Sequence, residues 1–347
     1  MHHEDLAPVP RSVGAATLAQ VALAAGVSTI TASRALGNPR MVSPKTVERV
    51  KAAAQRIGYV PNLLAGGLKS RRSRLVAMLL PAISGSPFLR TIQALTDTLS
   101  VHGYQVMLGQ IGYDHGHEDG LLDAIIGRRP DGIVVSGLIR SEAARDKLRA
   151  SGIPVVETWS MSEQPVDMLI GFSHERVGAE VATHLWRKGR RRFAIVSADD
   201  LRGTQRREGF VKTLRAMAAR SDEVLEEPPH YLVPAPSTVM GGRQALQSLL
   251  RQAPQLDAVY CNSDVLALGV LIEAQALGIA VPQQLAVFGF GDTELAAAMH
   301  PGLSTVRVDD IAIGQEAARR IIARAEGVDA GPSIVDVGFS IVERGSC

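Results

Sequence analysis

Apolar residues follow two different spacings along this chain. From Leu75 onward, short and nearly continuous apolar runs are separated by longer segments in which apolar residues recur every three or four positions. Runs of the first kind are typical of parallel strands whose two faces are both covered by helices. The sequence therefore predicts strands at residues 75–81, 104–111, 131–137, 154–159, 167–172, 191–198, 230–235, 257–263, 285–291 and 303–308.

The intervening segments predict amphipathic helices, and several are followed by a glycine suited to end a helix. Gly103, Gly152, Gly189 and Gly278 are in such positions. Because ten strands are too many for one ordinary open sheet, we expect two doubly wound α/β lobes that change over near residue 172. Ligands of such lobes bind in the cleft at the carboxyl ends of the strands. The expected helices cover residues 88–102, 174–188, 210–220, 265–277 and 311–326.

Residues 17–60 show helical periodicity without any strand pattern. Thr17 is suited to cap a first helix with an apolar stripe, and Gly26 permits the left-handed turn that ends it. Ser28 follows as the cap of a second helix, and Ser43 as the cap of a third. A short glycine-centred link between two small helices is typical of a helix-turn-helix domain.

The second helix places three side chains where a recognition helix meets base edges. Ile30 and Arg34 share the outward face, and Thr29 is exposed at the N-terminal end. Arginine can bind guanine through two hydrogen bonds, whereas isoleucine offers only apolar contact, for instance to a thymine methyl. The alternative is that Arg34 is an ordinary surface arginine on a small helix.

Residues 61–74 predict a hinge between this domain and the rest of the chain. Pro61 and Asn62 begin a short apolar helix that is too brief, and too rich in glycine, to be stable alone. We expect it to be disordered off DNA and to fold on DNA, with Leu68 as a wedge in the minor groove. A plain linker with incidental leucines is the alternative. Residues 1–16 predict a disordered tail.

Charge distinguishes the N-terminal part from the remainder. Residues 17–74 contain ten Lys or Arg and one Glu, although the net charge of the whole chain is only +2. A basic head on a mildly acidic body suggests that the head alone has a polyanionic partner. A basic solvated face without a partner remains an alternative at this point.

The composition favours a soluble cytoplasmic protein. No apolar stretch is long enough to span a membrane, the N-terminus lacks the apolar core of a signal peptide, and Cys261 and Cys347 form no disulfide framework. None of the specific nucleotide-binding, hydrolase or metalloprotease motifs occurs, so we expect no enzyme, cofactor or metal. Residues 114–119, DHGHED, could hold a metal, but such residues also cap helices. The rival classes are an α/β enzyme and a periplasmic solute-binding protein.

Four regions of the sequence together resemble the LacI/GalR family of bacterial repressors. They are AGVSTITASRAL at 25–36, VSPKTVERV at 42–50, GYVPNLLAGGL at 58–68, and the cleft segments described below. HGYQVML at 102–108, GIPVVET at 152–158, VGFSI at 337–341 and the terminal GSC are most similar to gluconate-operon repressors.

The resemblance implies an N-terminal all-α helix-turn-helix domain, residues 17–60, joined by the hinge to an α/β two-lobed periplasmic-binding-protein-like domain, residues 75–347. The first lobe would comprise about 75–172 and 303–332, and the second about 173–302 and 333–347. The resemblance also implies a homodimer on a palindromic operator. Its base readers would be Thr29, Ile30 and Arg34, and its intercalating residue Leu68. Further expected DNA contacts are Thr17, Ser28, Thr31, Ser33, Asn62 and Ala65.

The expected effector is a small sugar acid such as gluconate, 2-ketogluconate or 6-phosphogluconate, acting as inducer or corepressor. Arginine suits the anionic group because its fork matches a carboxylate or phosphate. Arg206 and Ser263 match positions where the family contacts its ligand. The family commonly places an Asp after GFG; here that position is Gly291, with Asp292 next. The expected effector contacts are Ser84, Phe88, Glu157, Arg202, Arg206, Ser263 and Asp292.

Overall fold

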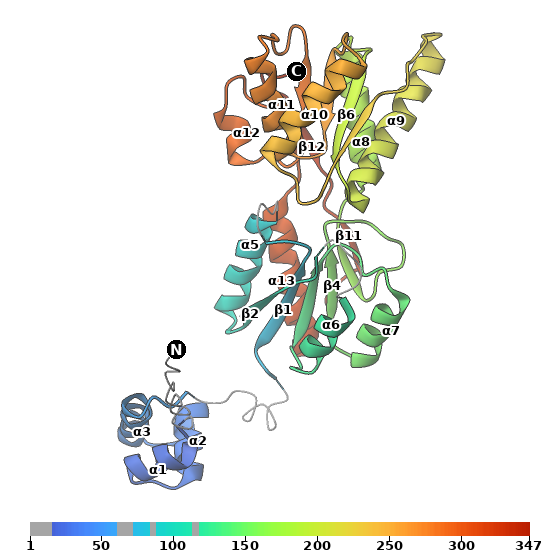
Figure 1. Cartoon of the computed structure of the whole chain (residues 1–347). Coiled ribbons are helices and arrows are strands. Elements are labelled where there is room, and N and C mark those ends of the chain that lie inside the picture. The colour runs from blue at the N-terminus through green and yellow to red at the C-terminus, as the bar shows by residue number, and fades with distance from the viewer. Residues whose placement is uncertain (1–15, 61–71, 84–87, 113–117) are drawn as a thin grey trace, which may run out of the picture. The chain divides into compact units, whose positions relative to one another are not determined.

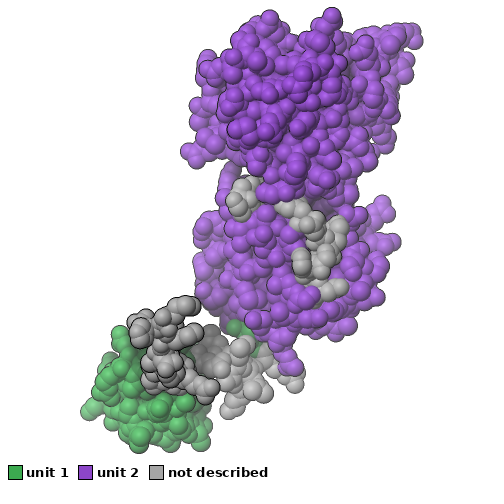
Figure 2. Space-filling view, in the orientation of Figure 1, with its two compact units in different colours: residues 1–73 green, residues 74–347 purple. Residues whose placement is uncertain are grey.

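The computed structural model describes residues 16–60, 72–83, 88–112 and 118–347, and divides the chain into two compact units, residues 1–73 and 74–347 (Figure 2). Several expectations lie outside the described residues. They are the tail at 1–15, the hinge contacts Asn62, Ala65 and Leu68, the effector contact Ser84, and residues 114–117 of the acidic histidine-containing segment.

The first unit consists of short helices around a small apolar core, as predicted. Thr17 caps the first helix through a reciprocal capping box with Gln20, and Ser28 and Ser43 cap the second and third. Gly26 ends the first helix in the left-handed conformation. The core contains Val21, Ala22, Ala25, Ala32, Ala35, Val47, Val50, Ala53 and Ala54. The elements are α1 Leu18–Ala25, α2 Thr29–Gly37, the 3₁₀ turn η1 Pro39–Met41 and α3 Pro44–Arg56.

The first lobe of the second unit is built on a six-stranded parallel sheet in the order β11-β5-β4-β3-β1-β2 (Figure 1). Alternate residues of β1 enter two different cores, so helices cover both faces. Its strands are β1 Leu75–Leu80, β2 Gln105–Gln110, β3 Gly132–Ser136, β4 Val155–Thr158, β5 Met168–Gly171 and β11 Ile334–Asp336. Its helices are α5 Leu89–Val101, α6 Glu118–Ile126, α7 Glu142–Ser151 and α13 Asp310–Glu326.

The second lobe repeats this plan on a four-stranded parallel sheet in the order β7-β6-β8-β9. Its strands are β6 Phe193–Ala198, β7 His230–Val233, β8 Ala258–Cys261 and β9 Ala286–Phe288. Its helices are α8 His174–Arg187, α9 Leu201–Ser221, α10 Val239–Gln252, α11 Asp264–Ala276 and α12 Glu294–Ala298. The predicted parallel α/β lobes are therefore confirmed. Within the described residues, no helix is long and apolar enough to cross a membrane.

The structure corrects three details of the predicted elements. Residues 303–308 do not lead directly into the first lobe, because β10, Thr305–Arg307, pairs antiparallel with β12, Ser340–Val342, and Ser304 bridges to β9. β11 extends the first sheet beyond residue 332, where the return to the second lobe was expected. α9 begins at Leu201 rather than Phe210, since Asp200 caps a first half too polar to show a stripe. The three-residue strands β11 and β12 were not predicted, because so short a run carries little alternation.

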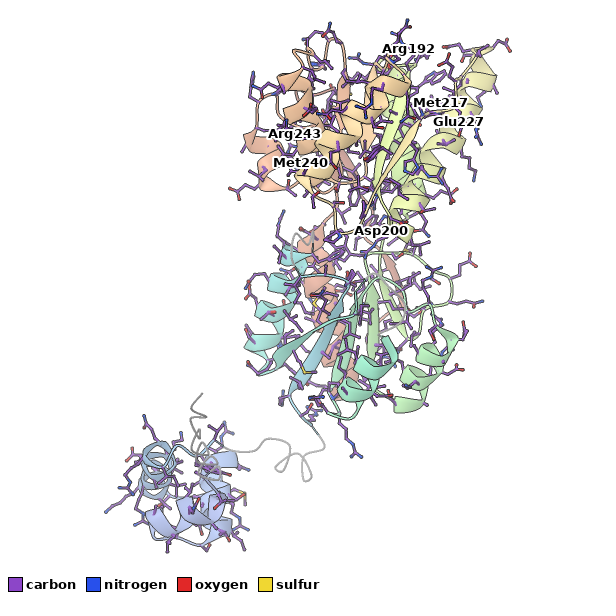
Figure 3. The ribbon with its side chains drawn as sticks, in the orientation of Figure 1. Arg192, Asp200, Met217, Glu227, Met240 and Arg243 are labelled. Carbon is purple, nitrogen blue, oxygen red and sulfur yellow. The ribbon has the colours of Figure 1, made fainter. Side chains whose placement is uncertain are left out.

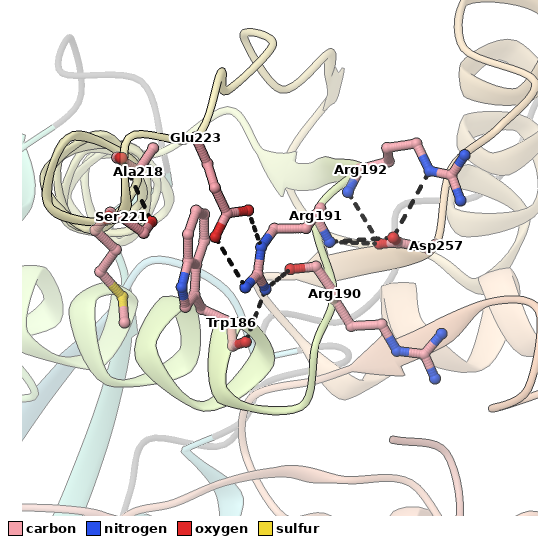
Figure 4. Close-up of polar contacts among 9 residues, drawn as sticks. Trp186, Arg190, Arg191, Arg192, Ala218, Ser221, Glu223 and Asp257 are labelled. Atoms are coloured by element: carbon pink, nitrogen blue, oxygen red, sulfur yellow. Dashed lines mark hydrogen bonds and ion pairs between the residues drawn. The ribbon is translucent and has the colours of Figure 1, made fainter.

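Three consecutive arginines, residues 190–192, connect α8 to β6, and their contacts hold this connection in place (Figure 4). The Arg191 guanidinium lies 4.0 Å from the centre of the Trp186 ring and pairs with Glu223. The backbone amides of Arg191 and Arg192 donate to the carboxylate of Asp257. This basic run is therefore engaged within the lobe.

Two glycines bring α8 and α9 into backbone contact. A Cβ atom at Gly178 would overlap the carbonyl oxygen of Arg206, and one at Gly209 would overlap that of Glu175. The close approach fixes the position of the first half of α9, which carries Arg202 and Arg206.

We expect Gly178→Ala to destabilise the second unit by about 1–3 kcal/mol, because the added methyl forces two helix backbones apart. Urea unfolding followed by circular dichroism measures this loss. Gly120→Ala is the matched control, since a Cβ there meets no atom within 4 Å. It should be neutral or slightly stabilising, by up to about 1 kcal/mol. Equal effects of the two substitutions would contradict the close helix contact.

Candidate DNA-reading surface and effector cavity

The outward face of α2 forms a shallow groove in the first unit. Its walls are made by Leu18, Thr29, Ile30, Ser33 and Arg34. The side chain of Ile30 is 64% exposed although it is large and apolar. The groove thus combines one guanidinium, two hydroxyls and two apolar side chains.

The remaining expected DNA contacts of the first unit have structural roles. Thr17 accepts a hydrogen bond from the Gln20 amide, and the Ser28 hydroxyl accepts one from the Thr31 amide at 3.2 Å. The hydroxyls of Ser28 and Thr31 are also 2.9 Å apart. These residues fix where α1 and α2 begin, and so set the position of the groove.

A cavity of about 130 Å³ lies between the two lobes of the second unit. Most of its residues follow the carboxyl ends of strands, as the fold predicts, and Asp200 is labelled at this junction in Figure 3. The first lobe contributes Phe88 and Trp159. The second lobe contributes His174, Ala198, Asp200, Arg202, Arg206, Ala235, Pro236, Ser237, Asn262, Ser263, Asp264, Val265, Phe290, Gly291 and Thr293.

Arg206 is the central cation of this cavity. Its side chain is held by His174 Nδ1 at 2.8 Å, by the carbonyl oxygen of Asn262 at 3.2 Å, and by the Phe290 ring, whose centre is 4.2 Å from Cζ. The residue is only 5% exposed, and burial lowers the pKa of its guanidinium. Among the described residues it forms no ion pair, and its buried Nε has no hydrogen-bond partner.

His174 is neutral and has a defined tautomer. Because the arginine always donates, Nδ1 of His174 must be the unprotonated acceptor. Nε2 therefore carries the proton and donates to the carbonyl oxygen of Trp159 at 2.9 Å. Burial, followed by the charges of Arg206 and Arg202, lowers the pKa of His174 well below its ordinary value. His174 thus links the cation of the second lobe to the backbone of the first.

Aromatic rings complete the wall of the cavity. Phe88 and Trp159 meet edge to face with centroids 5.0 Å apart, and Trp159 meets Phe172 in the same way at 5.8 Å. Arg202 lies over the Phe88 ring at 4.8 Å. The lining of this cavity therefore combines apolar ring faces with polar groups.

Two further polar groups come from the segment after β8. The Asn262 side chain is 2% exposed; its Oδ1 accepts from the Ala198 amide, while its Nδ2 has no partner. The carboxylate of Asp264 accepts from the Thr305 hydroxyl at 2.6 Å and the Thr293 amide at 2.8 Å. Burial raises the pKa of Asp264 in spite of these hydrogen bonds.

The structure brings four of the expected effector residues to one cavity and places two elsewhere. Phe88, Arg202, Arg206 and Ser263 line it. Glu157 does not: its fully buried carboxylate accepts from the amides of Ile139 and Val166. Because successive residues of a strand point to opposite sides, a glutamate near the end of β4 can turn away from the cleft.

Asp292 also has a different role from the one expected. It accepts hydrogen bonds from Arg307 at 2.5 Å and Arg344 at 2.7 Å, and it is absent from the cavity wall. Burial opposes ionisation of Asp292, but the two arginine hydrogen bonds outweigh it and lower its pKa. The loop after β9 has a positive φ at Gly291 and at Asp292, which turns this carboxylate toward β10 and the C-terminal segment.

Sequence reasoning missed several residues of the cavity. Trp159 and His174 follow strands β4 and β5, so their strand-end positions were the available signal. Asn262 and Asp264 flank Ser263, which was predicted. Phe290 was assigned to a strand rather than to the loop that follows β9. In the described part of the chain, no group of three or more His, Cys, Asp or Glu residues could hold a metal ion.

Comparison with known proteins matches both parts of the chain. Residues 17–62 match the lacI family of bacterial regulatory proteins, and residues 182–347 match the periplasmic binding protein-like domain. The HTH-type transcriptional regulator GntR of Pseudomonas aeruginosa is 37% identical over 337 residues, 97% of each chain. GntR of Escherichia coli K12 is 30% identical over 330 residues, 95% of this chain and 98% of that one. A solved LacI-family regulator from Silicibacter pomeroyi has a TM-score of 0.87 and 33% identity, covering 95% of this chain and 99% of its own.

The buried neutral histidine predicts a dependence of stability on pH. As pH falls through about 6.5, the unfolded chain takes up a proton at this residue that the folded chain does not, so unfolding becomes easier. Below about pH 6.5, His174 should lower the free energy of unfolding by up to about 1.4 kcal/mol for each unit by which the pH falls. We expect His174→Gln to show a shallower slope than the parent between about pH 6.5 and 5. His300→Gln, at an exposed histidine outside the cavity, should keep the parental slope. Identical slopes for parent and His174→Gln would contradict the assignment.

Proposed function

This chain belongs to the LacI family of bacterial regulatory proteins, and on that premise we propose that it represses genes of sugar-acid catabolism and is released from its operator by a small sugar acid. The family supplies the class of protein: a transcriptional regulator that binds duplex DNA. A cytoplasmic homodimer on a palindromic operator completes the proposal, since two copies of the reading surface would each meet one half-site.

The observation that carries the effector proposal is the Arg206 guanidinium, buried in the cavity without a carboxylate partner. Burying a charge without a counter-ion costs several kcal/mol, so an anion entering the cavity would be stabilised strongly. Arg206 Nε and Asn262 Nδ2 are both donors without partners, which a carboxylate can satisfy. The aromatic rings of Phe88 and Trp159 then suit the carbon chain of the same molecule.

The coupling to DNA follows from where the cavity lies. Residues of both lobes line it, so a ligand that contacts both favours one arrangement of the lobes over the other. Operator and effector would then oppose each other through a single coupling free energy, typically about 1–3 kcal/mol. A corepressor would make the same contacts but would strengthen operator binding instead of weakening it. Gel shifts with and without the sugar acid distinguish the two effects.

Removal of the central cation should abolish the effector response without removing DNA binding. In gel shifts with the promoter fragment, sugar acids should weaken binding by the parent protein and leave Arg206→Ala unaffected. Arg207→Ala is the matched control, because it removes the same charge from the next residue of α9, outside the cavity. A normal response of Arg206→Ala would place the effector elsewhere, and tighter binding of the parent on adding sugar acid would identify a corepressor.

Removal of the α2 arginine should impair sequence reading. We expect Arg34→Ala to lower affinity for the operator by about 1–3 kcal/mol while binding to random duplex DNA changes little. Arg49→Ala, at an exposed position on α3 outside the groove, should affect both DNAs alike if it affects either. Competition gel shifts at two salt concentrations measure both quantities, since the sequence-independent part falls steeply with salt. An equal loss on both DNAs for Arg34→Ala would contradict a base-reading role.

A further inference from the structure

A second cavity of about 450 Å³ lies in the same cleft. It shares Asp200 and Arg202 with the first cavity, so those two residues form a common wall. The first lobe contributes Ser136 and Arg140 to it, and the second lobe adds Asp199. The two cavities therefore adjoin each other at Asp200 and Arg202.

The lining of the second cavity differs in chemistry from that of the first. Ser136 is 3% exposed, and its hydroxyl has no hydrogen-bond partner among the residues that the structure describes. Among the described residues of the lining, the positive charges of Arg140 and Arg202 are matched in number by the carboxylates of Asp199 and Asp200. Sugar hydroxyls both donate and accept, which suits such a mixed lining.

A terminal phosphate would fit this lining poorly. At neutral pH a phosphate monoester carries a charge of about −1.5 to −2. The Asp200 carboxylate accepts a hydrogen bond from the Gly203 amide at 2.6 Å as the cap of α9, so its position is fixed. Asp199 adds a second carboxylate beside it, on an exposed side chain. Like charges brought together in a binding site disfavour the wrong ligand.

We propose that the second cavity is the hydroxyl-chain compartment of the effector site and that Asp199 excludes ligands with a terminal phosphate. The inference rests on the proposed function, which places the carboxylate at Arg206. The effector is then an unphosphorylated polyhydroxy acid that spans both cavities. Asp199 is a specificity-determining residue, and Ser136 contacts the hydroxyl chain.

Calorimetric titration of the full-length protein with gluconate and with 6-phosphogluconate tests the ligand class. We expect gluconate to bind at least about tenfold more tightly. If 6-phosphogluconate binds as tightly or more tightly, the exclusion is overturned while the proposed function stands. If neither acid binds, and neither alters operator binding, the proposed function itself fails.

Two variants then test the individual residues. Asp199→Asn should raise the affinity for 6-phosphogluconate severalfold and so reduce the preference for gluconate over 6-phosphogluconate. Asp146→Asn, the same change on the exposed surface of α7, should leave both affinities unchanged. Ser136→Ala should weaken gluconate severalfold with operator binding unaltered. An unchanged ratio of the two affinities in Asp199→Asn would overturn the role of Asp199. Full gluconate affinity in Ser136→Ala would overturn the assignment of the second cavity.

Discussion

The cleft of this protein is organised around Arg206, a buried arginine that forms no ion pair with any of the described residues. Arg206 is held by neutral groups only: an imidazole, a carbonyl oxygen and an aromatic face. Each of these satisfies part of the guanidinium, but none neutralises it, and one of its donors stays unpartnered. A buried charge in this condition is a standing cost to stability, which an anionic ligand offsets when it binds. Under the proposed function, the free site is therefore less stable than the site with an anionic effector bound.

The fold holds Arg206 there by contacts at some distance from the cavity. The absence of side chains at Gly178 and Gly209 lets α8 and α9 approach backbone to backbone. The same two helices supply His174 at the start of α8 and the arginines in the first half of α9. This one packing contact therefore fixes the positions of both Arg206 and His174, whose ring accepts a hydrogen bond from the guanidinium. His174 is neutral because burial lowers its pKa, and because a protonated ring would face the Arg206 guanidinium as a second cation.

Much of this arrangement follows from the sequence, and the exceptions have physical reasons. Strand ends predict that Arg202, Arg206 and Ser263 reach one cleft, because the carboxyl ends of parallel strands meet at one edge of each sheet. The cap residues Thr17, Ser28 and Ser43 predict the helices of the first unit correctly. Glu157 was assigned wrongly because the sequence does not show which residues of β4 point to which face of the sheet. Asp292 was misplaced because a left-handed loop reverses the direction of its side chain. His174 was missed because its role depends on Arg206, which lies on another helix.

The altered role of Asp292 shows how the site and the lobe connection are joined. Gly291 and Thr293 border the cavity, and Asp292 between them is bonded to Arg307 of β10 and to Arg344 just beyond β12. β10 and β12 are the antiparallel pair on either side of α13 in the chain, where the backbone passes between the second lobe and the first. In the same loop, the Thr293 amide donates a hydrogen bond to one carboxylate oxygen of Asp264. The other oxygen of Asp264 accepts a hydrogen bond from the Thr305 hydroxyl of β10. The wall of the cavity and the crossing strands are therefore tied by two carboxylates. Under the proposed function, a ligand that moved this loop would have to move or break those hydrogen bonds, and the connection between the lobes would then respond to occupancy of the cavity.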